Sequence, residues 1–431
     1  MADELILLKN MDNPDARALD FYRAGGGYSA LKKALSMQPD EITEEVKKAG
    51  VRGRGGAGFP AGVKWGFVPK QSDKPKYLCC NADEGEPGTF KDRAIMEWDP
   101  HMLIEGMVIA SFAIGIHTAY IYIRGEFHWI TLILEKAIEE ARAANLVGQN
   151  ILGSGFDCEI YVHEGAGAYI CGEETALIES LEGKRGQPRL KPPFPAVVGV
   201  FGGPTVVNNV ETLACVPHIV NRGSDWFTSI GPERNAGPKI FPVSGHVRKP
   251  GNYELPMGTP LREIIYDVCG GIPGDKKVKA VIPGGSSTPV LTADEIDVRM
   301  DFDSLAAIGS MFGAGSIIVM DETTCIVRAC MVLARFYAHE SCGQCTPCRE
   351  GVPWMYDIIK RIMRGEGKKE DPDLLLDICV NIEGNTICPL GDAAVGPVRS
   401  MVMKFREEFD YYIEHGTSMV GDAGFDFRPQ D

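Results

Sequence analysis

Three cysteines at two-residue intervals, Cys342, Cys345 and Cys348, constrain this chain more than any other feature of its sequence. Such spacing wraps a tight loop around three corners of a cuboidal [4Fe–4S] cluster, and a remote fourth thiolate closes the last corner. In ferredoxin-type runs the fourth cysteine stands where this chain has Val352. The fourth ligand is therefore expected from a distant segment.

Two distant cysteines compete for this fourth position. Cys388 precedes Pro-Leu-Gly in a loop-like segment, whereas Cys379 has the position of a buried residue on a helix, so Cys388 is favoured. A structural zinc site is the alternative to a cluster. Zinc sites usually present paired C-x-x-C units separated by a loop, with no consecutive triplet, so the spacing favours iron and sulfur.

The remaining cysteines fit a reducing compartment. Thirteen cysteines in 431 residues do not have the spacing of a small secreted scaffold, and clustered cysteines in a reducing compartment more often bind metal than form disulfides. Several stand in apolar or strand-like surroundings and are expected to be buried structural thiols, since free cysteine behaves as a small hydrophobe. These are Cys158, Cys215, Cys269, Cys325 and Cys330.

Length and charge limit the class of protein. A chain of 431 residues is expected to form two or three domains, and 44 basic against 59 acidic residues gives a net charge of −15. This charge argues against nucleic acid as a main ligand. No run of eighteen apolar residues and no basic, apolar leader is present. We expect a cytoplasmic protein without direct membrane insertion, which docks onto a membrane assembly through partners.

Residues 1–235 alternate strand-like and helix-like segments. The apolar runs 77–80, 119–123 and 159–162 are typical of strands, and the amphipathic segment 129–144 between the last two is typical of a helix. This alternation predicts an α/β, Rossmann-like domain with an N-terminal helical segment.

The rest of the chain shows two further sequence patterns. Residues 236–322 contain short strands, at 240–245 and 279–285, around a helix-like segment at 261–268, which predicts a small α+β domain of ubiquitin-like β-grasp type. Residues 323–431 have helical periodicity, with four helices and short glycine-bearing connections. A C-terminal four-helix bundle that carries the cysteine triplet is expected.

A glycine-rich loop follows a helix-like segment near the N-terminus. Its backbone N–H groups would approach a phosphate closely, with Arg54 and Lys64 supplying positive charge. It is not a Rossmann fingerprint, because residues 44–49 before it are helical in pattern where a strand is required. Phe59 and Phe67 flank it and either stack on a base or pack in the core. The loop itself comprises Gly53, Arg54, Gly55, Gly56, Ala57 and Gly58.

Three polar loops follow strands, where an open α/β sheet has its ligand crevice. After the first strand stand Asn81, Asp83, Glu84 and Glu86, whose side chains would bind hydroxyls of a ribityl chain or ribose unless they form an exposed acidic turn. Glu173 and Glu174 begin a helix after the third strand, where they either line a ligand edge or favour the helix dipole. Asn208 and Asn209 either contact the edge of a heterocycle or cap the next helix.

The motifs, in this order along the chain, resemble those of a known protein family. From about residue 20 to 415 the chain resembles the NADH-binding flavoprotein subunits of respiratory complex I, known in bacteria as the F subunits of NADH–quinone oxidoreductase. The motifs are Gly-Arg-Gly-Gly-Ala-Gly-Phe-Pro, Asn-Ala-Asp-Glu-Gly-Glu-Pro-Gly, Gly-Ala-Tyr-Ile-Cys-Gly-Glu-Glu-Thr-Ala-Leu, Asn-Asn-Val-Glu-Thr and Glu-Ser-Cys-Gly-Gln-Cys-Thr-Pro-Cys-Arg-Glu-Gly.

The resemblance implies non-covalent FMN, one [4Fe–4S] cluster and an NADH site. It assigns Glu86 and Glu174 to the nicotinamide side as catalytic acids, Phe59 and Phe67 to adenine stacking, and Lys191 to the dinucleotide. It assigns Cys342, Cys345, Cys348 and Cys388 to the cluster. The implied FMN positions are the glycine loop 53–58, Lys64, Asn81, Asp83, Tyr169, Gly172, Glu173, Asn208, Asn209 and Thr212.

The implied activity is hydride transfer from NADH to FMN, followed by single-electron transfer to the cluster. We hypothesise that Glu174 and Glu86 disfavour anionic reduced flavin and favour departing NAD⁺. Without an obvious extra arginine for a 2′-phosphate, the acid-lined site favours NADH over NADPH. Implied partners are a thioredoxin-like [2Fe–2S] subunit and a multi-cluster iron–sulfur subunit, in a complex on the cytoplasmic side of a membrane.

Other assignments remain open at this point. Close relatives serve as diaphorase subunits of NAD-linked hydrogenases or formate dehydrogenases, several with an extra ferredoxin-like domain. This chain has no additional cysteine clusters, which favours the complex I assignment. A non-catalytic iron–sulfur scaffold or a zinc-binding interaction module would explain the cysteines, but not the four glycine-rich and acidic loops.

Overall fold

The computed structural model describes residues 4–421, which form two compact units. The first contains residues 4–85, 89–242 and 252–259, and the second contains residues 86–88, 243–251 and 260–421. The three domain ranges expected from the sequence, 1–235, 236–322 and 323–431, remain a prediction.

The first unit is built on a parallel sheet of order β3-β2-β1-β4. Its strands are β1 (Tyr77–Ala82), β2 (Thr118–Ile123), β3 (Glu159–Glu164) and β4 (Thr205–Asn209). The three strands predicted from apolar runs are confirmed. The strand order reverses between β1 and β4, and ligands of doubly wound sheets bind at such a reversal, beyond the carboxyl ends of the strands.

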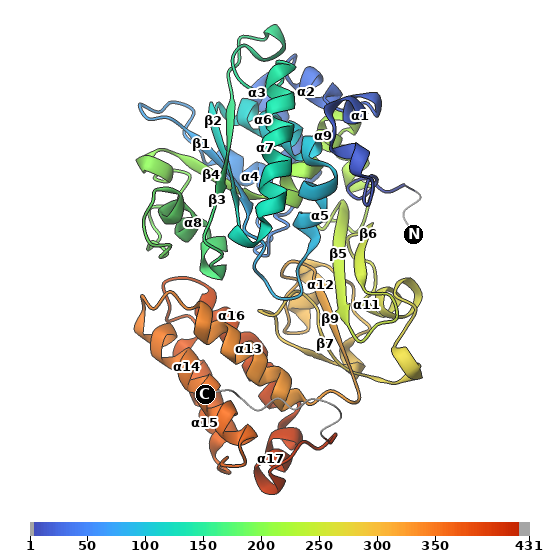
Figure 1. The fold of residues 1–431 in the computed structure, drawn as a ribbon, viewed down its shortest axis with the longest axis vertical. Coiled ribbons are helices and arrows are strands. Elements are labelled where there is room, and N and C mark those ends of the chain that lie inside the picture. Colours follow the sequence, from blue (N-terminus) through green and yellow to red (C-terminus); the bar gives the residue numbers. More distant parts are fainter. Residues whose placement is uncertain (1–3, 422–431) are drawn as a thin grey trace. The chain divides into compact units, whose positions relative to one another are not determined.

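Helices surround this sheet, and the longest apolar one is interior (Figure 1). Nearly every residue of this helix, α6 (Pro100–Ile114), is buried, because α6 packs on the sheet and on α9 (Val210–Arg222). Among residues 4–421, no helix combines the length and apolar character needed to cross a membrane. The helices are α1 (Leu19–Ala24), α2 (Ser29–Ala34), α3 (Pro39–Ala49), α4 (Ala61–Gly66), α5 (Lys91–Trp98), α6 (Pro100–Ile114), α7 (His128–Ala143), α8 (Glu174–Leu181), α9 (Val210–Arg222) and α10 (Ser224–Thr228).

Helices α6 and α9 approach each other closely at Gly106. A Cβ atom on Gly106 would lie 2.1 Å from the carbonyl oxygen of Leu213 in α9. Backbone cannot yield as a flexible side chain does, so only glycine fits here without moving a helix.

Replacing Gly106 with alanine is therefore expected to destabilise the chain by about 1–3 kcal/mol, the usual range for overpacking a core. Gly66→Ala is the matched control, because a Cβ there meets no described atom within 4 Å. Thermal unfolding followed by circular dichroism measures both. Equal melting temperatures for the two variants would contradict the close approach of α6 and α9.

The second unit contains a small mixed sheet. Its central strand β9 (Ile317–Asp321) pairs in parallel with residues Val243–Gly245 of β5. On its other side β9 pairs antiparallel with β7 (Val278–Ile282), and β7 also pairs with β8 (Leu291–Thr292). The predicted helix at 261–268 is one short helix followed by a π-helical turn, Ile264–Val268. The elements of this region are β5 (Pro238–Gly245), β6 (Gly251–Pro256), α11 (Leu261–Glu263), β7 (Val278–Ile282), β8 (Leu291–Thr292), α12 (Phe302–Ala307) and β9 (Ile317–Asp321).

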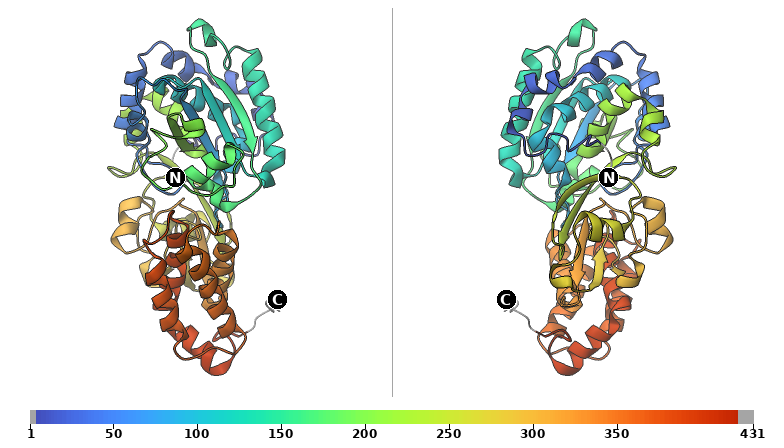
Figure 2. Two further views of the ribbon diagram at one scale, coloured as in Figure 1. Left: turned by 90° about the vertical axis from the view of Figure 1, so that its left-hand side faces the viewer. Right: turned by 90° about the vertical axis from the view of Figure 1, so that its right-hand side faces the viewer.

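The C-terminal part of the second unit is helical, orange to red in Figure 2. Four helices were expected here, and the described residues form five, because the backbone leaves the helical region at Phe405 (φ −127°, ψ 34°) between α16 and α17. The described helices here are α13 (Ile326–Glu340), α14 (Thr346–Met363), α15 (Asp371–Ile382), α16 (Leu390–Lys404) and α17 (Arg406–His415). They pack against one another as a bundle.

The cysteines expected to be structural lie in the interior. Burial raises the pKa of Cys158 and of Cys215 to about 12, so both are neutral thiols at physiological pH. Cys269, Cys325 and Cys330 are buried as well. The interpretation of these five residues as buried thiols is confirmed.

Candidate functional site

Polar side chains gather at the reversal between β1 and β4. Asn81 of β1 is the register partner of Asn209 of β4, and Asn208 is the partner of the residue before Asn81. Asp83 follows β1 directly, and its backbone N–H donates to the side-chain oxygen of Asn81 over 3.1 Å. The sheet therefore brings residues far apart in sequence to one ligand-binding edge.

The glycine loop lies against the same edge. The backbone N–H of Arg54 donates to Oγ1 of Thr212 over 2.9 Å, which ties the loop to α9. A Cβ on Gly55 would lie 3.1 Å from Cβ of Asn209. Gly56 has φ +126°, which side-chain-bearing residues rarely adopt, and a Cβ there would meet no described atom within 4 Å. The loop is thus open to a ligand at Gly56.

The side chain of Arg54 points into the protein. It is fully buried, and its guanidinium donates to the carbonyl oxygens of Ala236 (2.9 Å) and Pro238 (3.2 Å). Its Nε atom has no hydrogen-bond acceptor among the described residues. In this structure Arg54 therefore anchors the loop from behind.

Lys64 is the cation on the open side of the site. Its Nζ donates to Glu174 and to the carbonyl oxygen of Val207, each over 2.9 Å. Lys191 contacts Glu173 at 3.0 Å and Glu174 at 2.9 Å. Burial alone would raise the pKa of Glu174, but the charges of Lys64 and Lys191 hold it below its ordinary value. Glu174 is therefore ionised at neutral pH.

The segment before α8 completes this edge of the unit. Nδ2 of Asn81 donates to the carbonyl oxygen of Gly172 over 2.8 Å, and a Cβ on Gly85 would lie 3.3 Å from the Tyr169 ring. Glu173 accepts hydrogen bonds from the N–H groups of Thr175 and Ala176, so it caps α8. The sequence left open whether Glu173 serves the helix or a ligand; it does serve the helix.

Glu84 also has a structural partner. Its carboxylate accepts the backbone N–H groups of Asp92 (2.8 Å) and Arg93 (3.0 Å) at the start of α5. Burial, and then the nearby charge of Asp92, raise the pKa of Glu84 to about 7. Binding of a cofactor hydroxyl by Glu84 remains a prediction.

Phe59 and Phe67 form an exposed aromatic pair. Their ring centroids lie 5.9 Å apart, and the residues are 46% and 57% exposed. Core packing, one of the two interpretations from the sequence, is therefore wrong for both. Stacking on an adenine base remains a prediction.

Glu86 belongs to the second unit. Its Oε1 accepts the backbone N–H of Ser287 over 2.7 Å and the hydroxyl of Ser286 at 3.3 Å. The Ser286 hydroxyl in turn contacts that of Tyr337 at 2.7 Å. The predicted catalytic role of Glu86 remains a prediction.

The cysteine triplet begins helix α14. Cys345 is its N-cap, Cys348 lies in its first turn, and Gly343 turns the preceding loop with φ +73°. Burial, and then the nearby thiols of Cys345 and Cys342, raise the pKa of Cys348 to about 11. Within residues 4–421 no three potential ligand side chains surround the position of a single metal ion.

The two candidates for fourth ligand differ in their surroundings. Cys379 is buried on α15, and its thiol lies 3.6 Å from the sulfur of Met355 in α14. Cys388 is partly exposed in the loop before α16. Cys388 stays the predicted ligand.

Sequence reasoning did not single out the charged residues buried behind the glycine loop. Lys91 and Asp92 begin α5, Glu211 lies in the first turn of α9, and Lys239 lies in β5. Glu211 was visible only as a member of the Asn-Asn-Val-Glu-Thr motif. Lys239 is surrounded in sequence by apolar residues and gives no local signal.

Known protein families match most of the chain. Residues 46–218 match the Nuo51 FMN-binding domain, 239–319 the SLBB domain, and 328–412 the NADH-ubiquinone oxidoreductase-F iron–sulfur binding region. The second F subunit of NADH-quinone oxidoreductase from Rhizobium meliloti (strain 1021) is 59% identical over 95% of this chain and 98% of its own length. The chain belongs to the family of NADH-quinone oxidoreductase F subunits. The predicted resemblance and fold class are confirmed.

Further relatives and a solved structure agree with this membership. The F subunit of NADH-quinone oxidoreductase from Rickettsia bellii (strain OSU 85-389) is 53% identical over 95% of the chain and 98% of its own length. The crystal structure of an NAD⁺-reducing [NiFe]-hydrogenase in the H₂-reduced state is similar with a TM-score of 0.84 and 37% identity, over 95% of this chain and 67% of that one.

The family decides between the metal alternatives. Its iron–sulfur region covers Cys342, Cys345, Cys348 and Cys388, so the chain carries a [4Fe–4S] cluster, and the zinc interpretation is wrong. The FMN-binding domain covers the glycine loop and the edge between β1 and β4. An open loop backbone at Gly56, a cation at Lys64 and amide side chains suit a phosphorylated heterocycle, so these residues fit FMN.

Proposed function

We propose that this chain is the electron-input subunit of an NADH–quinone oxidoreductase. It takes a hydride from NADH at FMN and passes single electrons through its [4Fe–4S] cluster to partner subunits. One observation supports this proposal most strongly. The glycine loop, Asn81 and Asn209 meet where the strand order reverses, and the same chain contains the iron–sulfur region of the family.

FMN, when bound, supplies the conversion between a two-electron donor and one-electron carriers. The residues of the chain hold and orient the two ligands. Backbone N–H groups of the glycine loop and the Lys64 ammonium would hold the phosphate, and Asn81, Asn208 and Asn209 would orient the ring and its side chain. Glu174 would face the nicotinamide, Phe59 and Phe67 would stack on the adenine, and the catalytic role of Glu86 stays a prediction.

The purified chain tests this function through its colour. We expect flavin absorbance near equimolar FMN and about four iron atoms per chain, and NADH added without oxygen bleaches the flavin band. NADPH at the same concentration bleaches it far more slowly. Colourless, iron-free protein after gentle anaerobic preparation would contradict the proposal.

A diaphorase subunit of an NAD⁺-linked hydrogenase or formate dehydrogenase is the second candidate, favoured by the similarity to the hydrogenase structure. The bacterial quinone-oxidoreductase relatives, with higher identity over nearly their full length, favour the first. In the first case the partners are a thioredoxin-like [2Fe–2S] subunit and a multi-cluster iron–sulfur subunit, and the complex lies peripherally on the cytoplasmic side of a membrane. Affinity purification and mass spectrometry of the associated subunits distinguish the two.

A further inference from the structure

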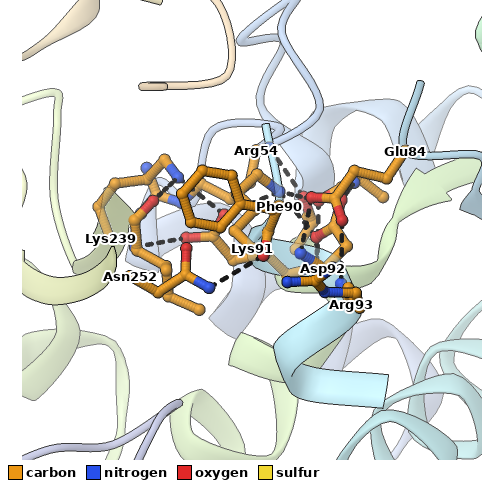
Figure 3. Close-up of polar contacts among 12 residues, drawn as sticks. Arg54, Glu84, Phe90, Lys91, Asp92, Arg93, Lys239 and Asn252 are labelled. Carbon is orange, nitrogen blue, oxygen red and sulfur yellow. Dashed lines mark hydrogen bonds and ion pairs between the residues drawn. The ribbon is translucent and has the colours of Figure 1, made fainter. Parts of the chain in front are cut away.

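Lys91, Asp92, Glu211 and Lys239 form a buried ionic network; Figure 3 labels Lys91, Asp92 and Lys239, with Arg54 of the glycine loop beside them. The Lys91 ammonium contacts Asp92 at 2.7 Å and Glu211 at 3.0 Å, and Lys239 contacts Glu211 at 2.9 Å. The side chains of these four residues are at most 4% exposed. Two ammonium and two carboxylate groups compensate one another in charge.

Pairing maintains the charges of Glu211 and Lys91, whereas burial lowers the pKa of Lys239 to about 8 despite its contact with Glu211. Burial alone would raise the pKa of Glu211, but Lys239 and Lys91 hold it at about 2. Burial alone would lower the pKa of Lys91, but Asp92 and Glu211 keep it above its ordinary value. Both central groups are therefore ionised at neutral pH, and the fixed charges persist in an interior where unpaired charge is costly.

The network ends on Asn209. Its Oδ1 accepts hydrogen bonds from the Lys91 ammonium over 3.2 Å and from the backbone N–H of Glu211 over 3.0 Å, so Asn209 also caps α9. Its Nδ2 donates to Oδ2 of Asp92 over 2.7 Å. The ammonium and the backbone N–H only donate and the carboxylate only accepts, so these three partners permit one orientation of the amide. Within the described residues Asp92 takes one of the two N–H bonds of Nδ2, which leaves the second to donate to a ligand.

The fixed amide lies beside the glycine loop. Nδ2 of Asn209 would lie 3.6 Å from a Cβ on Gly55, and Asn209 is the register partner of Asn81. A rotated amide would present an oxygen where a donor is needed, at the cost of a lost hydrogen bond. The orientation of the Asn209 amide therefore decides whether the site presents a hydrogen-bond donor or an acceptor to FMN.

We propose that Lys91 and Asp92, supported from behind by Glu211 and Lys239, are positioning residues that hold the Asn209 amide in the orientation that binds FMN. This inference rests on the proposed function, since it requires FMN at the reversal between β1 and β4. The four residues touch no ligand themselves. They act through Asn209.

A double-mutant cycle tests the inference on the full chain. Asp92→Asn replaces an obligate acceptor with an amide that does not fix the orientation of its neighbour. We expect the FMN dissociation constant, measured by quenching of flavin fluorescence, to rise about ten- to a hundredfold, the usual worth of a hydrogen bond to a charged group. In an Asn209→Ala background the same substitution is expected to change it by less than threefold, because the amide is gone.

Controls separate positioning from general destabilisation. Glu105→Gln alters another buried carboxylate of the first unit, which accepts hydrogen bonds from Tyr22, Tyr28 and Leu31, and is expected to leave FMN affinity within twofold. The same cycle with Lys91→Gln gives an independent arm if Asp92→Asn does not fold. Each variant is measured below its melting temperature.

The outcomes distinguish two failures. If Asp92→Asn weakens FMN binding equally with and without the Asn209 side chain, the positioning inference is overturned while FMN binding stands. If the wild-type chain itself binds no FMN, the proposed function fails and the network has no cofactor to position.

Discussion

Replacing Cys388 with alanine is expected to remove the [4Fe–4S] cluster. A cuboidal cluster needs a thiolate at each of its irons, and Cys342, Cys345 and Cys348, which lie in the iron–sulfur region, are the predicted ligands of three of them. Iron content is expected to fall from about four atoms per chain to below one, with loss of the electron paramagnetic resonance signal of the reduced cluster. Transfer to one-electron partners is expected to fall at least a hundredfold, while NADH still bleaches the flavin.

Cys379→Ala is the matched control, because Cys379 was the other candidate for the fourth ligand. Its thiol packs against Met355 in the interior, so its loss leaves a small cavity. We expect a cost of about 1 kcal/mol in unfolding free energy with full iron content. A Cys388→Ala chain with four iron atoms, or a Cys379→Ala chain without iron, would contradict the assignment.

Much of the fold follows from local patterns. Apolar runs bounded by turn residues gave β1, β2 and β3, because a buried parallel strand needs a continuous apolar stretch. Strand order leaves no such trace, since it depends on crossovers and packing between distant segments. The break at Phe405 escaped the helical pattern for a related reason, because the apolar periodicity continues across it.

Some features of the candidate site could likewise be predicted from the sequence, and others could not. Polar residues after strands were predicted to meet at one edge of the sheet, and β1 and β4 do bring Asn81 and Asn209 together there, because parallel strands end at the same edge. The direction of the Arg54 side chain depends on carbonyl oxygens of residues 236 and 238, far along the chain. The ion pair of Lys239 could not be predicted for the same reason, because the fold alone brings its partner Glu211 next to it.

Replacing Glu174 with glutamine is expected to raise the reduction potential of bound FMN. Glu174 contacts Lys64 and Lys191, and with Glu173 these make a group of two cations and two anions. The substitution removes one anion and leaves a net positive charge, which favours the more negative, reduced cofactor. A unit charge near a redox group is worth about 1–2 kcal/mol at the effective dielectric constant of a protein site, or about 20–40 mV for a two-electron couple.

The pH dependence follows from the ionisation of Glu174. Since Lys64 and Lys191 lower the pKa of Glu174, its carboxylate stays ionised as pH falls from 8 to 6, and the difference in potential persists over that range. Spectroelectrochemical titration measures it. Glu159→Gln is the control, because Glu159 pairs with Arg142 at the amino end of β3 and its loss is expected to leave the potential unchanged. If Glu174→Gln left both the FMN potential and the NADH affinity at wild-type values, Glu174 would serve only to anchor the two lysines.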